Sequence, residues 1–426
     1  MSNSTWSINA ASEPDSYHDA GNWSLGVPTI GDTAFFGKSN TTSISIGAGE
    51  EVGGWTFNPG ASQYNFFLNN NFFNFDGEGI IINGGGLKID NLGHLEFFNN
   101  STAGSASIKN ENQVIFFDGS TAGNAIITNE NTTTFTNPHF IILDAGVIFL
   151  SNSTAGNATI ETISGATTVF EDFSTGGNAR LIADGGGLVD FSLSSGPNGD
   201  GRLSVGSIEG PGTYDLGADQ LTVGGNERPA TASGPIDDGG FGGGSGARLV
   251  KVGHGELTLS HAFNTYSGGT GLDAGTLELA AVQAAGIGAI TFAPGSHATL
   301  KIDNAALPGH VFGNEIDFFG KHDVIDLSGL HFQPGAFATF HHQRLKVHSG
   351  GKADTLKLLS PHGTHFTVAN DGRGGSKVTL EQLPPVTSLP AAAVAHSVAG
   401  HDHAAQHWAT DTAGSAGYPG DFLFVA

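Results

Sequence analysis

The sequence predicts an all-β protein: a single right-handed parallel β-helix, or β-solenoid, with an N-terminal cap and a flexible C-terminal tail. Three observations predict this fold class. A short phrase of the form STAGNATI occurs four times along the chain. Apolar residues within each copy alternate with a period of two, which is typical of strands. The composition, with 66 Gly and 30 Phe among 426 residues, favours turns and β-ladders over helices.

The four copies are STAGSASI (101–108), STAGNAII (120–127), STAGNATI (153–160) and STGGNARL (174–181), and a phenylalanine lies four residues ahead of each. Their serines are 19, 33 and 21 residues apart. A repeat built from two helices needs roughly 33 residues or more, whereas a coil of about twenty residues suits a parallel β-helix. The 33-residue interval predicts one coil with an extra excursion around residues 137–139.

Each copy is expected to form a corner followed by a strand. Gly and Asn tolerate the left-handed backbone angles of a corner. The alanine and the aliphatic residue that follow are two apart, as in Ala125 and Ile127. Coils stacked about 4.8 Å apart should align phenylalanines and aliphatic residues in internal ladders and present Ser, Thr, Asn and Gly outward. The repeat therefore predicts packing rather than a site.

Residues 1–60 are expected to form the N-terminal cap and the first coils. Gly and Pro separate the apolar residues between Trp6 and Gly37, as in short strands and turns. A cap is needed because an open coil end exposes unpaired strand edges. Residues 61–229 are expected to form the solenoid that contains the repeats. Asn69–Asn71 should form a stacked corner in it, with a ligand-binding edge as the alternative.

Residues 230–247 (ATASGPIDDGGFGGGSGA) are predicted to form a glycine-rich loop. This run has neither the lysine nor the following helix of a phosphate-binding loop. Asp237 and Asp238 could contribute to a calcium site, but two acids without a ligand cage are usually solvated.

Residues 248–380 are expected to continue the solenoid. The segment 249–280 contains the patterns K-x-G-x-G-x-L-T-L-S, N-T-Y-x-G-G-T and A-G-T-L, at Lys251–Ser260, Asn264–Thr270 and Ala274–Leu277. It resembles the passenger-associated repeat of bacterial autotransporters. The resemblance implies one β-helix coil of a secreted or surface-displayed protein, and it carries over no catalytic residue. The opening motifs GNWS-x-G-x-P and GDTAFF resemble the start of such passenger domains.

Two further segments resemble the ends of proteins that bacterial type I systems export. The segment 322–330 (HDVIDLSGL) contains D-x-I-D-L-S, and Asp421–Val425 is acidic and then apolar. The N-terminus shows neither the basic start nor the apolar core of a classical export signal. The resemblance thus implies type I secretion. A calcium roll is not expected, because the glycine–aspartate nonapeptide is not recognisable.

Residues 381–426 are expected to form a linker, a His-rich tail and a candidate secretion signal. The candidate metal ligands are His401, His403 and His407, because imidazole binds zinc, nickel and copper. A second group contains His341, His342 and His348. Both groups are expected mainly as solvated polar residues. Weak divalent metal binding by the tail is the hypothesis, and no resident cofactor is predicted.

The formal charge of −24 disfavours nucleic acid and anionic membrane surfaces as partners. No stretch is long and apolar enough to span a bilayer as a helix. The absence of cysteine excludes disulfides and thiolate zinc sites. We expect an exported bacterial structural or adhesive protein, secreted or on the cell surface, that binds a cell surface, matrix or glycan through many weak contacts. Self-association is a further hypothesis.

The alternative is a β-helix lyase or hydrolase that degrades polysaccharides. Such enzymes need clustered acids on one outer face. The acids that could line one side are Glu161, Glu171, Asp172 and Asp184. Acids on a solvated solenoid also serve solubility, and only seven Lys or Arg precede Lys251. We therefore predict no catalytic residue; a groove holding two carboxylates about 5 to 10 Å apart would favour the enzyme.

Overall fold

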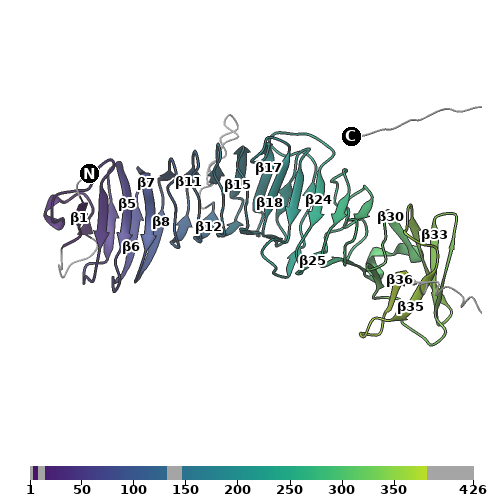
Figure 1. Cartoon of the computed structure of the whole chain (residues 1–426). Coiled ribbons are helices and arrows are strands. Elements are labelled where there is room, and N and C mark those ends of the chain that lie inside the picture. Colours follow the sequence, from purple (N-terminus) through teal and green to yellow (C-terminus); the bar gives the residue numbers. More distant parts are fainter. Residues whose placement is uncertain (1–2, 8–14, 132–145, 381–426) are drawn as a thin grey trace, which may run out of the picture. The chain divides into compact units, whose positions relative to one another are not determined.

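The computed structural model describes residues 3–7, 15–131 and 146–380. In this part the chain forms a parallel β-solenoid of about 12 turns. Successive strands belong to different sheets, so each strand pairs with a strand of the preceding or following coil. Figure 1 shows these strands lying side by side from β5 to β24. The predicted all-β parallel solenoid is confirmed.

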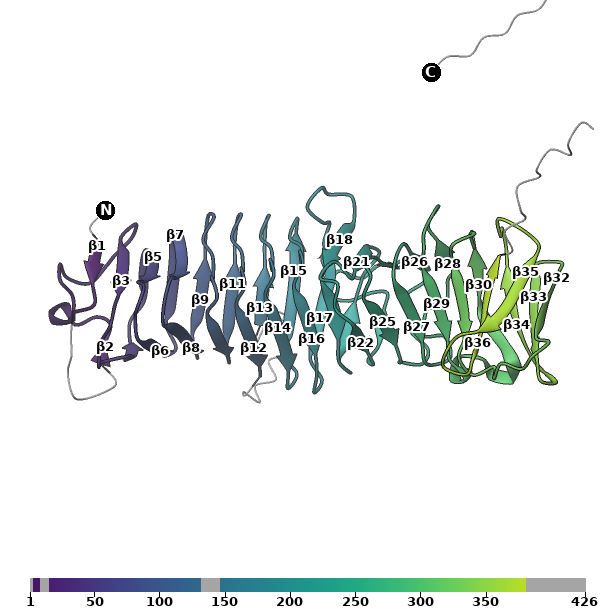
Figure 2. The same cartoon turned by 60° about the horizontal axis from the view of Figure 1, so that its bottom comes forward.

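Two sheets form the first part of the solenoid, and Figure 2 shows their strands from a second direction. Sheet 1 consists of β1 (Asn3–Thr5), β3 (Thr33–Phe36), β5 (Glu50–Phe57), β7 (Phe72–Ile82), β9 (His94–Phe97), β11 (Gln113–Phe116), β13 (Gly146–Phe149), β15 (Thr167–Asp172), β17 (Leu188–Ser194), β20 (Thr213–Asp215) and β23 (Ile236–Asp237). Sheet 2 consists of β2 (Asp15–Ser16), β4 (Ser43–Ile46), β6 (Gln63–Leu68), β8 (Gly86–Asn91), β10 (Ser107–Asn110), β12 (Ile126–Glu130), β14 (Thr159–Ile163), β16 (Arg180–Ala183) and β19 (Ser207–Glu209).

Two more sheets form the second part, accompanied by the short 3-10 helices η2 (Asn304–Ala306) and η3 (Pro308–His310); η1 (Ala20–Asn22) lies near the N-terminus. Sheet 3 consists of β18 (Arg202–Val205), β21 (Gln220–Val223), β24 (Arg248–Lys251), β26 (Thr270–Leu272), β28 (Ile290–Phe292), β30 (Val311–Asp317), β34 (Lys352–Leu358), β33 (Arg344–Ser349) and β32 (Phe337–His341). Sheet 4 consists of β22 (Ala230–Ala232), β25 (Glu256–Leu259), β27 (Thr276–Leu279), β29 (Thr299–Ile302), β31 (Val324–Leu327), β36 (Ser376–Leu380) and β35 (Phe366–Asn370).

Sheets 2 and 4 form one continuous face, because a parallel bridge between Gly210 and Ala232 connects β19 to β22. A further face begins as a column of single parallel bridges between successive repeat threonines, ending with Thr154 and Thr175. The Ser204 amide in β18 then donates to the Thr175 hydroxyl (3.3 Å), so sheet 3 continues this column. Sheet 1 ends at β23, so the later coils of the described region form strands only in sheets 3 and 4.

The repeats set the register of the core. Ile108 pairs with Ile127, Ile127 with Ile160, and Ile160 with Leu181, and all four side chains are buried. The phenylalanines ahead of the repeats form a second buried column, with ring centroids 4.8 Å apart from Phe97 through Phe116 and Phe149 to Phe170. Both predicted internal ladders are confirmed.

The long repeat interval leaves this register unchanged. Gln113 of β11 pairs with Gly146 of β13, and Phe116 pairs with Phe149. The extra residues are therefore accommodated between β12 and β13 without shifting the stack. Residues 137–139, where the sequence predicts the excursion, lie outside the described residues.

The prediction that the repeat serines point outward is wrong. Ser101, Ser120, Ser153 and Ser174 are fully buried. Each precedes a bridge threonine, and the residue two positions after each serine is buried as well: Ala103, Ala122, Ala155 and Gly176. Adjacent side chains on an extended backbone point to opposite sides, so the partly exposed threonine forces its serine neighbour inward. Serine is small enough for this corner.

A buried asparagine ladder stabilises another corner. Asn91 Nδ2 donates to Asn110 Oδ1 (2.7 Å), and Asn110 Nδ2 donates to Asn129 Oδ1 (2.8 Å). Asn91 and Asn110 end β8 and β10, Asn129 is the next-to-last residue of β12, and all three are nearly or fully inaccessible. Hydrogen bonds between rungs thus satisfy amide groups that would be costly to bury alone.

An aromatic cluster lies at the N-terminal end of the stack, where the sequence predicts a cap. The Trp6 and Trp23 rings pack edge to face with centroids 5.2 Å apart, and Tyr17 lies 5.0 Å from Trp23. Trp55 Nε1 donates to the Tyr17 hydroxyl (3.3 Å). All four rings are buried, and β1 and β2 are the terminal strands of sheets 1 and 2.

The C-terminal strands of the described region pair differently from the expected continuation of the solenoid to Leu380. β30 and β34 are parallel, whereas β34, β33 and β32 pair antiparallel, as do β31, β36 and β35. His342–Gln343 and Gly350–Gly351, which link β32 to β33 and β33 to β34, all have positive φ. Two-residue turns of this kind join antiparallel strands, since a parallel pair needs a longer crossover.

Candidate binding face

The continuous face of sheets 2 and 4 carries a series of charged side chains, which form four ion pairs among the described residues. We call it the charged face and define it by the outward residues Lys109, Glu130, Glu161, Arg180, Glu209, Glu256, Thr258, Glu278 and Lys301. These side chains alternate with buried aliphatic residues such as Leu257 and Leu300, so the strand period places them outward.

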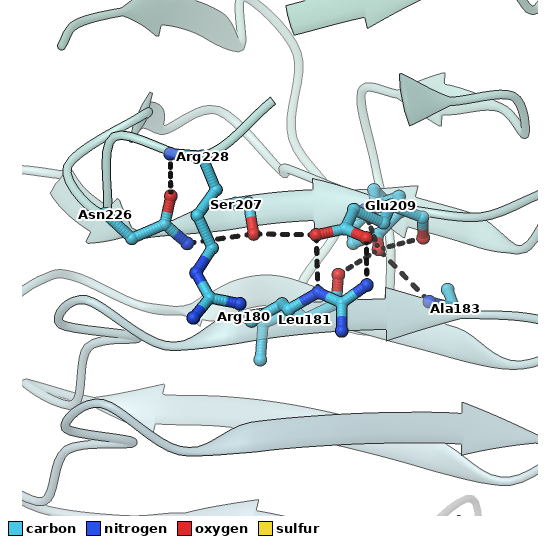
Figure 3. Close-up of polar contacts among 8 residues, drawn as sticks. Arg180, Leu181, Ala183, Ser207, Glu209, Asn226 and Arg228 are labelled. Carbon is cyan, nitrogen blue, oxygen red and sulfur yellow. Dashed lines mark hydrogen bonds and ion pairs between the residues drawn. The ribbon is translucent and has the colours of Figure 1, made fainter. Parts of the chain in front are cut away.

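Arg180 and Glu209 form a bidentate ion pair on this face (Figure 3). Arg180 Nε donates to Glu209 Oε1 (2.7 Å) and Nη2 donates to Oε2 (2.6 Å). The Ser207 hydroxyl donates to the same Oε1 (3.0 Å), and Asn226 Nδ2 donates to Ser207 Oγ (3.0 Å). A bidentate arginine–carboxylate pair with these further bonds fixes the orientation of both groups. The hydrogen bonds to Glu209 raise the pKa of Arg180.

A buried tyrosine supports this pair from inside the solenoid. The Tyr214 hydroxyl accepts from the amides of Ala183 (3.1 Å) and Glu209 (3.0 Å). The carbonyls of Leu181 (2.9 Å) and Glu209 (2.7 Å) lie within range of its single proton. Burial raises the pKa of Tyr214 well above its usual value, so the hydroxyl stays protonated. It thereby ties β16 to β19 beneath the charged pair.

A second cluster lies farther along the face. Lys301 Nζ donates to Glu278 Oε1, and the Thr258 hydroxyl donates to Glu278 Oε2 (2.7 Å). Burial alone would raise the pKa of Glu278, but the hydrogen bonds from Lys301 and Thr258 outweigh it and hold that pKa below its usual value. Glu256 lies beside Glu278, shares a side-chain hydrogen bond with it and also interacts electrostatically with Lys301.

An open pocket of about 400 Å³ separates the two clusters. Its lining includes Glu209, Glu256, Thr231, Thr258 and Ile182. The pocket lies beside β22, a short strand that contributes only three residues to the face. Carboxylate and hydroxyl oxygens around an apolar floor can accept hydrogen bonds from a hydroxylated ligand. Both oxygens of Glu209 already accept from Arg180, which makes this group a poor nucleophile or proton donor.

The four acids named for the enzyme alternative do not meet in one site. Glu161 lies on sheet 2, whereas Glu171 and Asp172 lie on sheet 1. Asp172 accepts from the Ser151 amide (3.0 Å), and Asp184 accepts from the Gly185 amide (2.6 Å). The latter two carboxylates therefore stabilise turns.

The two aspartates of the glycine-rich segment hold its loop in place. Asp238 accepts from the amides of Gly246 (3.1 Å) and Ala247 (2.9 Å) and from the Ser267 hydroxyl (2.6 Å). Asp237 accepts from the Thr265 hydroxyl (2.7 Å). The carboxylates of Asp237 and Asp238, which were candidate calcium ligands, are therefore engaged in these hydrogen bonds.

The described residues contain no group of three or more His, Asp or Glu able to hold a metal ion. His341 and His342 are exposed at the turn between β32 and β33, and the His348 ring stacks on Phe337 with centroids 4.7 Å apart. The proposed ligands His401, His403 and His407 lie outside the described residues, as does Asp421–Val425.

The other segment with a secretion-type motif, 322–330, is part of the folded end. Asp323 is buried and accepts from the Ser296 hydroxyl (2.7 Å) and the Gly320 amide (2.8 Å). Val324–Leu327 is strand β31, and Leu330 is buried. The aspartate, isoleucine and leucine of the motif thus have packing roles.

The motif residues of segment 249–280 are structural too. Lys251 is buried, and its ammonium donates to the carbonyls of Val252 (2.7 Å), Gly253 (2.9 Å) and Ala274 (3.3 Å). Burial lowers the pKa of Lys251 to about 8. Asn264 Nδ2 donates to the Ala284 carbonyl (2.7 Å). These polar residues connect consecutive coils, and sequence reasoning identified the motif without predicting those contacts.

A comparison with known families identifies a family model that matches this segment. The family model of the passenger-associated-transport-repeat matches residues 249–279. No curated protein and no solved structure matches the chain. This repeat within a parallel β-solenoid is typical of autotransporter passenger β-helices, so the resemblance seen in the sequence is confirmed for this repeat. Such repeats are typical of secreted or surface proteins. Of the helices in the described ranges, none has the length and apolar character needed to cross a membrane.

Proposed function

We propose that this protein is an exported bacterial surface or extracellular β-solenoid with a structural or adhesive role. It is non-catalytic, and it binds a cell surface, a matrix or a glycan through repeated weak contacts. The charged face carries this proposal: its ionic and hydroxyl groups repeat in strand register, are fixed by hydrogen bonds and border an open pocket. Many weak contacts on one rigid scaffold increase affinity through effective concentration.

A non-catalytic role is supported by how the carboxylates are used. Glu209 is paired with Arg180, Glu278 with Lys301, and the four acids considered for catalysis are divided between sheets and turns. The rival, a polysaccharide lyase or hydrolase, would have to use Glu209 and Glu256 across the open pocket. Self-association is also proposed, and the net charge of −24 disfavours nucleic acid as a partner.

The test is retention of the purified chain on glycan arrays and on bacterial cells. Glu256→Gln should lower retention at least threefold, because it replaces one acceptor oxygen of the pocket rim by an amide donor and removes the negative charge. Asp273→Asn is the matched control, since it removes one negative charge from an exposed turn. Absence of retention on every surface would exclude adhesion. Release of oligosaccharides from a polysaccharide, lost on Glu209→Gln, would establish the enzyme instead.

Export by a type I system and weak metal binding by the tail are also proposed. Deleting residues 421–426 should abolish appearance of the protein in culture supernatant, and unchanged export would exclude a terminal signal. Calorimetric titration with zinc near neutral pH should give heat that disappears when His401, His403 and His407 are replaced by alanine. No heat with the unaltered chain would exclude the metal site.

A further inference from the structure

A second pocket lies on the outward side of sheet 1, away from the charged face. It has a volume of about 510 Å³ and is lined by Asn70, Asn71, Phe72, Asn74, His94 and Glu96. The lining comes from two consecutive coils, because Phe72 of β7 pairs with His94 of β9 and Asn74 pairs with Glu96. The pocket therefore adjoins the asparagine corner for which the sequence left a ligand-binding edge open.

Phe72 provides an exposed aromatic surface. Its side chain is 49% exposed although large apolar groups usually avoid water. The ring lies against the backbone of the preceding coil: a Cβ atom added to Gly49 would come within 2.3 Å of it. The absence of a side chain at Gly49 thus makes room for the ring. One part of the ring contacts protein while another stays open to a ligand.

The polar groups of the pocket include several acceptors of hydrogen bonds. Asn74 Oδ1 is buried and has no hydrogen-bond partner within the described ranges. Asn71 Nδ2 donates to the Asn69 carbonyl (2.7 Å), which fixes the amide and leaves its oxygen to the pocket. Burial raises the pKa of Glu96, an effect that nearby His94 opposes. A buried acceptor without a donor is costly, so this site favours a ligand that brings hydroxyl groups.

We infer that this pocket binds a neutral saccharide. The apolar C–H face of a pyranose would lie on the Phe72 ring, and its hydroxyls would donate to Asn74 Oδ1 and the Glu96 carboxylate. None of the described lining residues is Lys or Arg, and Glu96 repels anions, so uronic acids and sulfated sugars are disfavoured. The inference rests on the proposed glycan binding for its ligand class, but it uses a different surface.

The test titrates the full chain with maltohexaose, cellohexaose and a neutral galactohexaose, and measures saturation transfer from protein to sugar by NMR together with calorimetry. At least one sugar should show transfer to the protons of one pyranose face. Phe72→Ala should weaken this binding at least tenfold, whereas Phe72→Tyr should retain it. Gly49→Ala should weaken it as well, because the new methyl group displaces the ring. Phe263→Ala is the matched control, since it removes another exposed phenylalanine (62%) from a distant turn.

Each outcome is decisive provided that thermal unfolding shows the variants folded. Absence of transfer from all three sugars, or equal binding by Phe72→Ala, would overturn the inference. Stronger binding of a sulfated or uronic hexasaccharide would also overturn it. Adhesion that persists in the Phe72→Ala variant would support the proposed function without supporting the inference about the pocket. Saccharide binding that depends on Phe72, without retention on any surface, would support the pocket while excluding adhesion.

Discussion

Three aspartates stack in register on the outward side of sheet 1, and this arrangement should make stability depend on pH. Asp190 pairs with Asp215, and Asp215 pairs with Asp237. Asp190 accepts from the Phe241 amide and the Ser192 hydroxyl, and Asp237 accepts from Thr265, so the outer two carboxylates are hydrogen-bonded. Burial, followed by repulsion from Asp190 and Asp237, raises the pKa of Asp215 to about 6.

The direction in which stability changes with pH follows from this raised pKa. The folded state holds the Asp215 proton more tightly than the unfolded chain, whose pKa is near 3.8. The resulting stabilisation is complete below pH 3.8 and is lost as pH rises through about 6. A shift of this size corresponds to about 3 kcal/mol. Because the carboxylate is partly solvated, we expect about 1 to 2 kcal/mol.

Replacing Asp215 by Asn removes the charge while keeping the shape. Urea unfolding followed by far-UV circular dichroism should show Asp215→Asn to be more stable than the unaltered chain by about 1 to 2 kcal/mol at pH 7.5 and equal to it near pH 4. Asp273→Asn, at an exposed turn, should change little at either pH. A gain for Asp215→Asn that is the same at both pH values, or a loss at pH 7.5, would refute the electrostatic argument.

Three further substitutions test the packing inside the coils. Phe116→Ala removes an internal ring of the buried column and should destabilise the protein by about 3 to 5 kcal/mol in urea unfolding, and a loss below 1 kcal/mol would contradict the ladder. Tyr214→Phe leaves the amides of Ala183 and Glu209 without their acceptor and should cost about 2 to 4 kcal/mol, with no effect expected if water replaces the hydroxyl. Lys251→Met unpairs buried carbonyls and should lower the thermal unfolding midpoint by several degrees in calorimetry, whereas an unchanged midpoint would show that those carbonyls find other donors.

The sequence was sufficient to predict the internal ladders because they depend only on period. Equal spacing aligns Phe97 with Phe116, and Ile108 with Ile127, whatever the corner between them. The serine direction was not predictable in the same way, since it depends on whether the corner threonine takes part in a bridge. The Asn91–Asn110–Asn129 ladder could have been found, because its 19-residue spacing is the same as that of the first two repeats.

The charged pair at the centre of the binding face was not predictable from local pattern. Arg180 and Glu209 are 29 residues apart, and β17 and β18 intervene between their strands. Their pairing depends on β16 and β19 being neighbours in sheet 2, which a strand pattern does not specify. The antiparallel end could have been inferred in part, since Gly350–Gly351 is a typical two-residue hairpin turn.

The alternation of inward and outward side chains separates stability from surface chemistry in this fold. Phe75 and Phe97 stack inside, whereas Asn74 and Glu96, their neighbours in the same strands, line an outward pocket. An outward residue can therefore change without disturbing the ladder that sets the register. Outward substitutions such as Glu256→Gln should alter binding with little change in unfolding free energy, and inward ones such as Phe97→Ala should do the reverse. A solenoid with this property can present different ligand chemistry on successive coils while its core repeats.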